Sequence, residues 1–329
     1  MLILTKAILA SMIGFLLSAI IGLIAIPLLR KFKIGQNVSR SLKRHKGKAG
    51  TPTIGGVIFI SSTLLTMLIL YLMGRIDFSY NLLIVLIVFI GHAGLGFADD
   101  YVKIKQGNNK GISRTTKLIG QTIIALIFFY IFMSSGREPI IASTFFGIHL
   151  DLGWAFGLFI LFMLVGTANA VNLTDGLDGL AGGLSVICFV TYGLIVWNSG
   201  WLAGYEDIAY FCFTLAGAVL GFLLYNTHPA KVFMGDTGSL ALGGVLAAIA
   251  ILSQREVLLA IVGAVFVIET LSTFIQIVAI RKLNRRVFLM APLHHHFEKL
   301  GWDEQDIVKL FWTVGLFAAM AAIYYGVWI

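Results

Sequence analysis

Apolar runs of about 20 residues, separated by short polar segments, fill this sequence. A helix of that length crosses a bilayer core, where backbone polar groups need internal partners. Only 12% of the residues are charged, against about 25% in soluble domains. We therefore predict an all-α integral membrane protein, with residues 1–329 forming one polytopic membrane domain of about ten transmembrane helices. The predicted spans are residues 7–29, 54–73, 82–98, 118–133, 154–168, 180–197, 208–225, 239–252, 257–280 and 307–328.

The basic residues predict the orientation of these spans. Of the 24 Lys and Arg residues, 20 lie in segments 30–53, 99–117, 226–238 and 281–309. Because consecutive spans cross the membrane in opposite directions, these four segments lie on the same side. Basic residues accumulate on the cytoplasmic side, so both termini are predicted to lie outside. The run 7–29 is too long for a signal-peptide core and should be a retained span. The chain leaves no room for a soluble basic domain, so no nucleic-acid binding is predicted. Both Cys residues fall in apolar runs, and no disulfide framework is visible.

The stretch NAVNLTDGLDGLAGG, residues 169–183, is the most polar part of a long apolar region. It places Asn172, Asp175 and Asp178 between two apolar runs, where ionisable groups are costly and indicate function. If the chain is helical from Leu173 onward, the two Asp residues share one helix face. A glycine-rich loop with an ordinary Asp N-cap is the alternative.

Two further acidic clusters lie on the same predicted side of the membrane. Asp99 and Asp100 follow the third predicted span, where a carboxylate opposes the helix dipole. A divalent cation or the lysines that follow would stabilise this pair. Asp236 lies in the segment NTHPAKVFMGDTGS. An N-cap role for Asp236 or Thr237 is the alternative there.

The last third of the chain adds a buried acid and a histidine run. Glu269 lies deep in the ninth predicted span, where an ion or proton pathway and a structural hydrogen bond are both open. The run His294–His296 is predicted to be extended or turned, because three consecutive residues cannot share one helix face. A zinc site is disfavoured, since structural zinc sites use Cys and regular spacings.

Taken together, these groups favour a metal-assisted phosphate site on the cytoplasmic face. Carboxylates suit Mg²⁺, which completes its shell with water and substrate phosphates, and Lys and His balance phosphate charge. A site at the membrane surface implies one charged soluble substrate and one lipid substrate. A secondary transporter is the rival from another class, but its charges should lie near the bilayer midplane, which only Glu269 satisfies.

The motifs KAGTPTIGG, FADDYVK, GISRTTK, NAVNLTDGLDGLAGG, NTHPAKVFMGDTGS and APLHHHFE resemble those of the polyprenyl-phosphate N-acetylhexosamine-1-phosphate transferase superfamily. They extend from about residue 45 to residue 298. The HHHFE form favours the muramoyl-pentapeptide branch over the N-acetylglucosamine-1-phosphate transferases, which remain the nearest alternative. Two small departures occur: Ile54 replaces the usual Met, and the RTTK sequence leaves the role of Arg114 open.

The resemblance implies transfer of phospho-MurNAc-pentapeptide from UDP-MurNAc-pentapeptide to undecaprenyl phosphate in the bacterial inner membrane, with lipid I and UMP as products. It implies a homodimer and a Mg²⁺ cofactor with Asp236 as ligand. It also implies that Asp99 deprotonates or orients the lipid phosphate, beside Asp100, and that Phe233 stacks on uracil. The predicted catalytic residues are Asp99, Asp100 and Asp236. The predicted substrate-binding residues are Lys48, Thr53, Lys103, Lys117, Asn172, Asp175, Asp178, Asn226, Phe233, Gly235, His294, His295 and His296.

Overall fold

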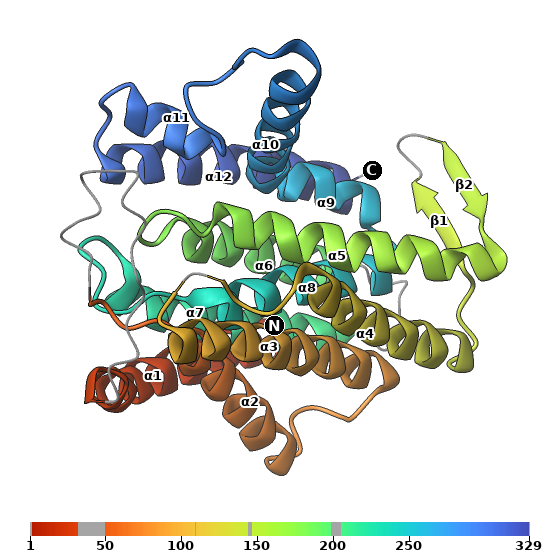
Figure 1. Ribbon diagram of the computed structural model, residues 1–329. Coiled ribbons are helices and arrows are strands. Elements are labelled where there is room, and N and C mark those ends of the chain that lie inside the picture. The colour runs from red at the N-terminus through yellow and green to blue at the C-terminus, as the bar shows by residue number, and fades with distance from the viewer. Residues whose placement is uncertain (1, 32–49, 109, 144–146, 199–204, 329) are drawn as a thin grey trace.

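The computed structural model describes residues 2–31, 50–108, 110–143, 147–198 and 205–328. Within these ranges the chain is mainly helical (Figure 1), which confirms the predicted all-α membrane class. The elements are α1 (Leu2–Lys31), α2 (Gly56–Leu72), α3 (Tyr80–Gln106), α4 (Arg114–Ser134), β1 (Ile140–Ser143), β2 (Ile148–Asp151), a 3-10 turn (Gly153–Ala155), α5 (Phe156–Thr174), α6 (Leu180–Asn198), α7 (Glu206–Asn226), α8 (Gly235–Leu252), α9 (Glu256–Val262), α10 (Ala264–Leu283), α11 (Leu293–Lys299) and α12 (Glu304–Trp328).

Helical structure covers most of each of the ten predicted spans. Within the described residues, nine helices are long and apolar enough to cross a membrane, and α2 has 17 residues, which is about 25 Å of helix. The ninth predicted span is not one helix, because Gly263 ends α9 and precedes α10. Glycine is a poor helix residue, and this break is a correction to the predicted continuous span.

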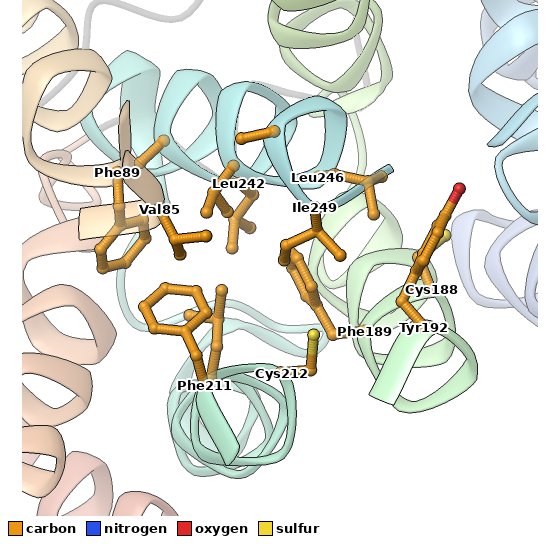
Figure 2. Packing of buried hydrophobic residues seen from close by; sticks show 14 of the residues in the cluster. Val85, Phe89, Cys188, Phe189, Tyr192, Phe211, Cys212, Leu242, Leu246 and Ile249 are labelled. Carbon is orange, nitrogen blue, oxygen red and sulfur yellow. The ribbon is translucent and has the colours of Figure 1, made fainter. Parts of the chain in front are cut away.

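Helix α8 forms the centre of the protein, with every residue from Thr237 to Leu252 buried. It packs against α2, α3, α5, α6 and α9. Figure 2 shows apolar side chains of α3, α6 and α7 filling the space beside it. Gly96 of α3 permits a close crossing, because a Cβ there would lie 2.1 Å from the backbone oxygen of Asp236. The polar end of α3 is therefore held directly against the first turn of α8.

Helices α3 and α5 both extend beyond their predicted ends. Helix α3 continues past residue 98 to Gln106, where Lys103 and Lys105 lie in its last turn and suit the helix dipole. Asp99 and Asp100 thus lie about two turns before the C-terminus of α3 and do not mark the end of the helix, which corrects the prediction. Helix α5 likewise continues through Asn172. Hydropathy shows only where the apolar residues end. The helices are longer because their backbone hydrogen bonds continue into the polar residues that follow.

Two elements near the chain's polar segments were not predicted. Residues 293–299 form α11, with Pro292 at its N-cap, so the predicted extended conformation of the histidine run is wrong. The prediction assumed that the three histidines act on one face. In the helix, each imidazole instead points to a different partner. The antiparallel hairpin β1–β2 pairs Ile140 with Asp151 and Ser143 with Ile148. It precedes the start of α5, at the end of that helix opposite to Asn172 (Figure 1).

The orientation across the membrane remains a prediction that accessibility can test. Met73 and Gln106 are both exposed and uncharged, and they are predicted to lie on opposite sides. In a background with the buried Cys188 and Cys212 replaced by Ala, a cysteine at Met73 should react with an impermeant thiol reagent in intact cells. A cysteine at Gln106 should react only after lysis. Reaction of both in intact cells would contradict the predicted orientation.

Candidate active site

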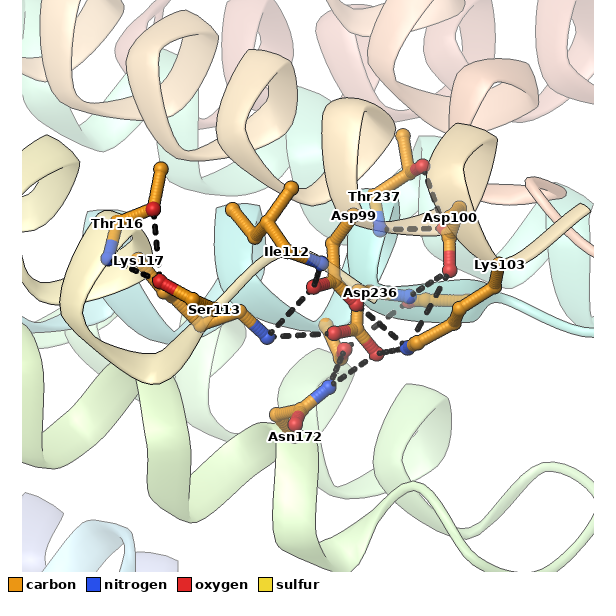
Figure 3. Close-up of polar contacts among 12 residues, drawn as sticks. Asp99, Asp100, Lys103, Ile112, Ser113, Thr116, Lys117, Asn172, Asp236 and Thr237 are labelled. Carbon is orange, nitrogen blue, oxygen red and sulfur yellow. Dashed lines mark hydrogen bonds and ion pairs between the residues drawn. The ribbon is translucent and has the colours of Figure 1, made fainter. Parts of the chain in front are cut away.

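Three carboxylates meet where the end of α3 approaches the start of α8 (Figure 3). Asp99 and Asp100 come from α3 and are each 2% exposed. Asp236 lies in the first turn of α8. Each contributes an oxygen to a group whose members all lie within 4.8 Å of one another. Carboxylates at this separation repel one another unless cations compensate them.

Lys103 and Lys117 supply that compensation. The Nζ atom of Lys103 lies 2.6 Å from Oδ2 of Asp99 and 3.1 Å from Oδ1 of Asp236. The Nζ atom of Lys117, at the start of α4, lies 2.7 Å from Oδ2 of Asp236 and 3.7 Å from Oδ1 of Asp99. Asp99 and Lys103 are neighbours one helical turn apart. Two cations therefore bridge the carboxylates of α3 and α8.

Asp100 binds the backbone at the start of α8. Its Oδ2 accepts the Thr237 backbone N–H at 2.9 Å and the Thr237 hydroxyl at 2.7 Å, and its Oδ1 accepts the Asp236 N–H at 3.2 Å. The first N–H groups of a helix have no partner within the helix, and the N-cap residue Met234 provides no side-chain hydrogen bond. Asp100 thus caps α8 from another helix, and the alternative that Asp236 or Thr237 is the N-cap residue is wrong.

The cap predicts a stability effect for Asp100. Asp100→Ala should lower the free energy of unfolding by about 1–2 kcal/mol, because buried N–H groups of α8 lose their acceptor. Asp100→Asn retains an acceptor oxygen at nearly the same volume and should lose less. Denaturation of the detergent-solubilised variants measures both changes. Equal stability of the Ala variant and the unaltered protein would contradict the capping role.

Helix α5 and the segment before α4 complete this cluster. The amide of Asn172 donates to Oδ1 of Asp236 at 2.9 Å and lies 2.8 Å from the Ser239 hydroxyl. Oδ1 of Asp99 accepts the backbone N–H of Ile112 at 3.0 Å. We call Asp99, Asp100, Lys103, Lys117, Asn172 and Asp236 the carboxylate cluster. Four helices contribute to it, so its geometry depends on the packing around α8.

Asp175 and Asp178 lie outside the carboxylate cluster. Helix α5 ends at Thr174, and residues 175–179 form a turn, so the prediction that both acids share a helix face is wrong. Oδ2 of Asp178 accepts the Ala230 N–H at 3.1 Å and lies 3.1 Å from Nδ1 of His228. The Asp178 N–H donates to Glu304 at 2.7 Å.

Asp178, His228 and Glu304 form a second group whose ligand atoms lie within 4.8 Å of one another. Sequence reasoning missed His228 and Glu304. His228 stands inside the quoted NTHPAK motif, which was the available signal. Glu304 opens α12 far along the chain, and no local pattern connects it to Asp178.

Asn226 and the TPT turn hold the neighbouring loops in place. The Asn226 side chain accepts from the Gly179 N–H at 3.2 Å and donates to the Val232 carbonyl at 3.0 Å. The half-buried Phe233 makes backbone hydrogen bonds with Pro52 and Gly55. Thr53 is buried beside Gly235, which opens α8 with a φ of 73°. Lys48 lies outside the described residues.

Each of the three histidines on α11 has its own partner. Nδ1 of His294 lies 3.1 Å from Oε2 of Glu269, and Nδ1 of His295 lies 2.6 Å from Oε2 of Glu298. Nδ1 of His296 accepts the Leu289 N–H at 3.1 Å. In the described part of the chain, neither group of residues that could hold a metal includes these histidines. The position of Glu269 favours the structural hydrogen bond over the ion pathway.

The chain is similar in sequence to known proteins. The family model for glycosyl transferase family 4 matches residues 82–254, which contain the carboxylate cluster but not the histidine helix. The chain is 47% identical over 324 residues to a phospho-N-acetylmuramoyl-pentapeptide-transferase of Geobacillus thermodenitrificans, covering 98% of both chains. It is 46% identical over 321 residues to the protein of that name from Bacillus subtilis, covering 97% of both.

The similarity covers nearly the whole length of these relatives, and the described helices match a polytopic membrane protein. The chain therefore belongs to the phospho-N-acetylmuramoyl-pentapeptide-transferase family.

Proposed function

We propose that this chain transfers phospho-MurNAc-pentapeptide from UDP-MurNAc-pentapeptide to undecaprenyl phosphate, producing lipid I and UMP in the first membrane step of peptidoglycan synthesis. The chain is a multi-pass protein of the bacterial inner membrane, and its relatives are transferases by name. The observation that carries the proposal is the carboxylate cluster. It gathers three acids and two lysines at the ends of apolar helices, where a lipid phosphate and a soluble diphosphate can meet.

The reaction joins two phosphates and releases a third group. An oxygen of the lipid phosphate forms a bond to the phosphorus that carries the sugar, and the bond between that phosphorus and UMP breaks. UMP leaves with the bridging oxygen and its electron pair. Both substrates are anionic, so positioning and charge compensation provide most of the catalysis. Lys103 and Lys117 are the described cations beside the cluster acids, and we assign them to the phosphates.

The acids of the cluster fit a Mg²⁺ ion. Asp100 is engaged with the backbone of α8, whereas both oxygens of Asp236 face lysines and the Asn172 amide. Asp236 is therefore the residue best placed to exchange a lysine contact for a metal, and we propose it as the ligand. When bound, Mg²⁺ neutralises charge on phosphate oxygens and polarises them.

Asp99 is proposed to orient the lipid phosphate or accept its remaining proton. Its carboxylate is buried and is held by the Ile112 N–H and by Lys103. A carboxylate fixed in this way supports direct attack by the lipid phosphate better than a covalent phospho-enzyme. The phosphate has a second pKa near 6, so its oxygen is largely deprotonated at neutral pH and needs no separate nucleophile.

The remaining predicted residues are proposed to bind the nucleotide sugar. Phe233 is assigned to uracil, and the turn at residues 175–179, braced by Asn226, to the nucleoside side. We also propose that two copies of the chain form a homodimer in the membrane.

The choice of sugar tests the proposed function. Purified protein with Mg²⁺ and undecaprenyl phosphate should release UMP from UDP-MurNAc-pentapeptide at least about a hundredfold faster than from UDP-N-acetylglucosamine, because a site built for polar groups discriminates strongly against a ligand lacking them. Chromatographic measurement of UMP in separate reactions gives both rates. Efficient release from UDP-N-acetylglucosamine would instead assign the chain to the N-acetylglucosamine-1-phosphate transferases.

A further inference from the structure

Glu269 holds one residue of the histidine helix by two hydrogen bonds. Its Oε1 accepts the backbone N–H of His294 at 3.0 Å, and its Oε2 lies 3.1 Å from Nδ1 of the same residue. Glu269 is 0% exposed and His294 is 1% exposed. Helix α10 thus fixes both the first turn of α11 and the orientation of one imidazole.

This contact determines which imidazole nitrogen carries the hydrogen. An ionised Glu269 only accepts hydrogen bonds, and Nδ1 of His294 then donates to it. The other nitrogen, Nε2, is buried and has no hydrogen-bond partner among the described residues. In the neutral imidazole, this contact leaves the hydrogen on Nδ1 and a lone pair on Nε2.

The unpaired nitrogen faces the turn at residues 175–179. A Cβ at Gly176 would lie 2.3 Å from Nε2 of His294, so the ring approaches this closely only because the residue is glycine. The turn carries Asp175 and Asp178, and the proposed function assigns this turn to the nucleoside side of the substrate. Glu269 and His294 thus connect α10 to the turn assigned to substrate.

We propose that Glu269 is a positioning residue for the nucleotide-sugar substrate, because it presents Nε2 of His294 as a hydrogen-bond acceptor at the turn 175–179. A bare imidazole nitrogen binds O–H or N–H groups. Phosphate oxygens at neutral pH offer few such donors, so the partner is a hydroxyl or amide of the nucleotide sugar and not its diphosphate. This assignment rests on the proposed function, and it replaces the role at the phosphates that the sequence predicts for His294.

Glu269→Gln separates positioning from packing. The Gln oxygen still accepts the His294 backbone N–H, but its NH₂ group faces Nδ1 and moves the imidazole hydrogen to Nε2. The dissociation constant for UDP-MurNAc-pentapeptide, measured by calorimetry without lipid, should rise about 10- to 100-fold, as expected for a lost hydrogen bond in a buried site. The KM for undecaprenyl phosphate should change less than about threefold.

Gly176→Ala tests the same contact from the other side, because the added methyl displaces the ring from the turn. It should weaken UDP-MurNAc-pentapeptide binding as Glu269→Gln does. Two matched controls lie elsewhere. Glu256→Gln changes another buried glutamate, and Gly166→Ala adds a methyl where nothing lies within 4 Å. Both should bind the nucleotide sugar with unaltered affinity.

A spectroscopic measurement tests positioning independently of activity. In protein labelled with ¹⁵N-histidine, with the His294 signals assigned by their loss in His294→Gln, the unaltered protein should show hydrogen on Nδ1 of His294. Glu269→Gln should show it on Nε2. Unaltered nucleotide-sugar affinity in Glu269→Gln, or hydrogen on Nε2 in the unaltered protein, would overturn the proposal. Absence of lipid I formation by the unaltered protein would instead overturn the proposed function and leave this test intact.

Discussion

Asp236→Asn is expected to lower the turnover of UDP-MurNAc-pentapeptide about a thousandfold, the cost of losing a central electrostatic group in an active site. Both oxygens of Asp236 are bound to lysines, and a neutral amide cannot balance those cations or serve as a Mg²⁺ ligand of the same strength. Lys103 and Lys117 retain Asp99 as an anionic neighbour, so neither becomes an isolated buried charge. The variant should therefore remain folded.

The measurement is UMP release at several Mg²⁺ concentrations, together with thermal unfolding in detergent. Asp207→Asn is the matched control, because Asp207 is a buried carboxylate in the first turn of another helix, α7. Asn226, which braces the turn at residues 175–179, lies at the other end of the same helix. The helical rise places Asp207 about 28 Å from it, so Asp207 is remote from the candidate site. This control should keep its activity. Near-normal turnover of Asp236→Asn at ordinary Mg²⁺ would exclude Asp236 as the metal ligand.

Asp99→Asn is expected to be about 10²- to 10⁴-fold slower than the unaltered protein, the usual contribution of a positioned acid or base. The residual rate should depend on the ionisation of the lipid phosphate itself. With a second pKa near 6, the ionised fraction rises about tenfold between pH 5 and pH 8. The residual rate should rise with it, because the phosphate then ionises without help.

Initial rates across that pH range check this expectation, with the unaltered protein as the reference for any general pH effect. The Asn side chain can still accept the Ile112 N–H, so the segment before α4 should keep its position. A covalent role for Asp99 predicts a different result. Asn cannot form the phospho-enzyme, so the variant would then be inactive at every pH.

Hydropathy predicted the spans well because lipid imposes one strong requirement, an apolar helix of sufficient length. Hydropathy did not predict the structure of the polar segments outside the lipid, where no such requirement applies. Asp99 and Asp100 continue α3 as a helix, since backbone hydrogen bonding does not stop at the first polar residue. The break at Gly263 and the helix that carries His294 were missed because local apolar pattern does not report tertiary partners.

In the candidate site, too, some contacts can be predicted from the sequence and others cannot. The four-residue spacing of Asp99 and Lys103 makes their ion pair predictable from the sequence. The pairing of Lys117 with Asp236 spans 119 positions. The predicted topology places both residues on the cytoplasmic face, but no sequence spacing predicts their contact. The capping of α8 by Asp100 and the support of His294 by Glu269 follow from helix packing, which no spacing in this sequence encodes.

We propose that one step at the carboxylate cluster moves the phospho-sugar from the UMP group of the donor onto the lipid phosphate. The most direct measurement follows labelled UDP-MurNAc-pentapeptide with purified protein and Mg²⁺, with and without undecaprenyl phosphate. Equal amounts of UMP and lipid I are expected when the acceptor is present. Without the acceptor, no UMP and no exchange of labelled UMP into UDP-MurNAc-pentapeptide are expected. Exchange by lipid-free protein would contradict a one-step transfer.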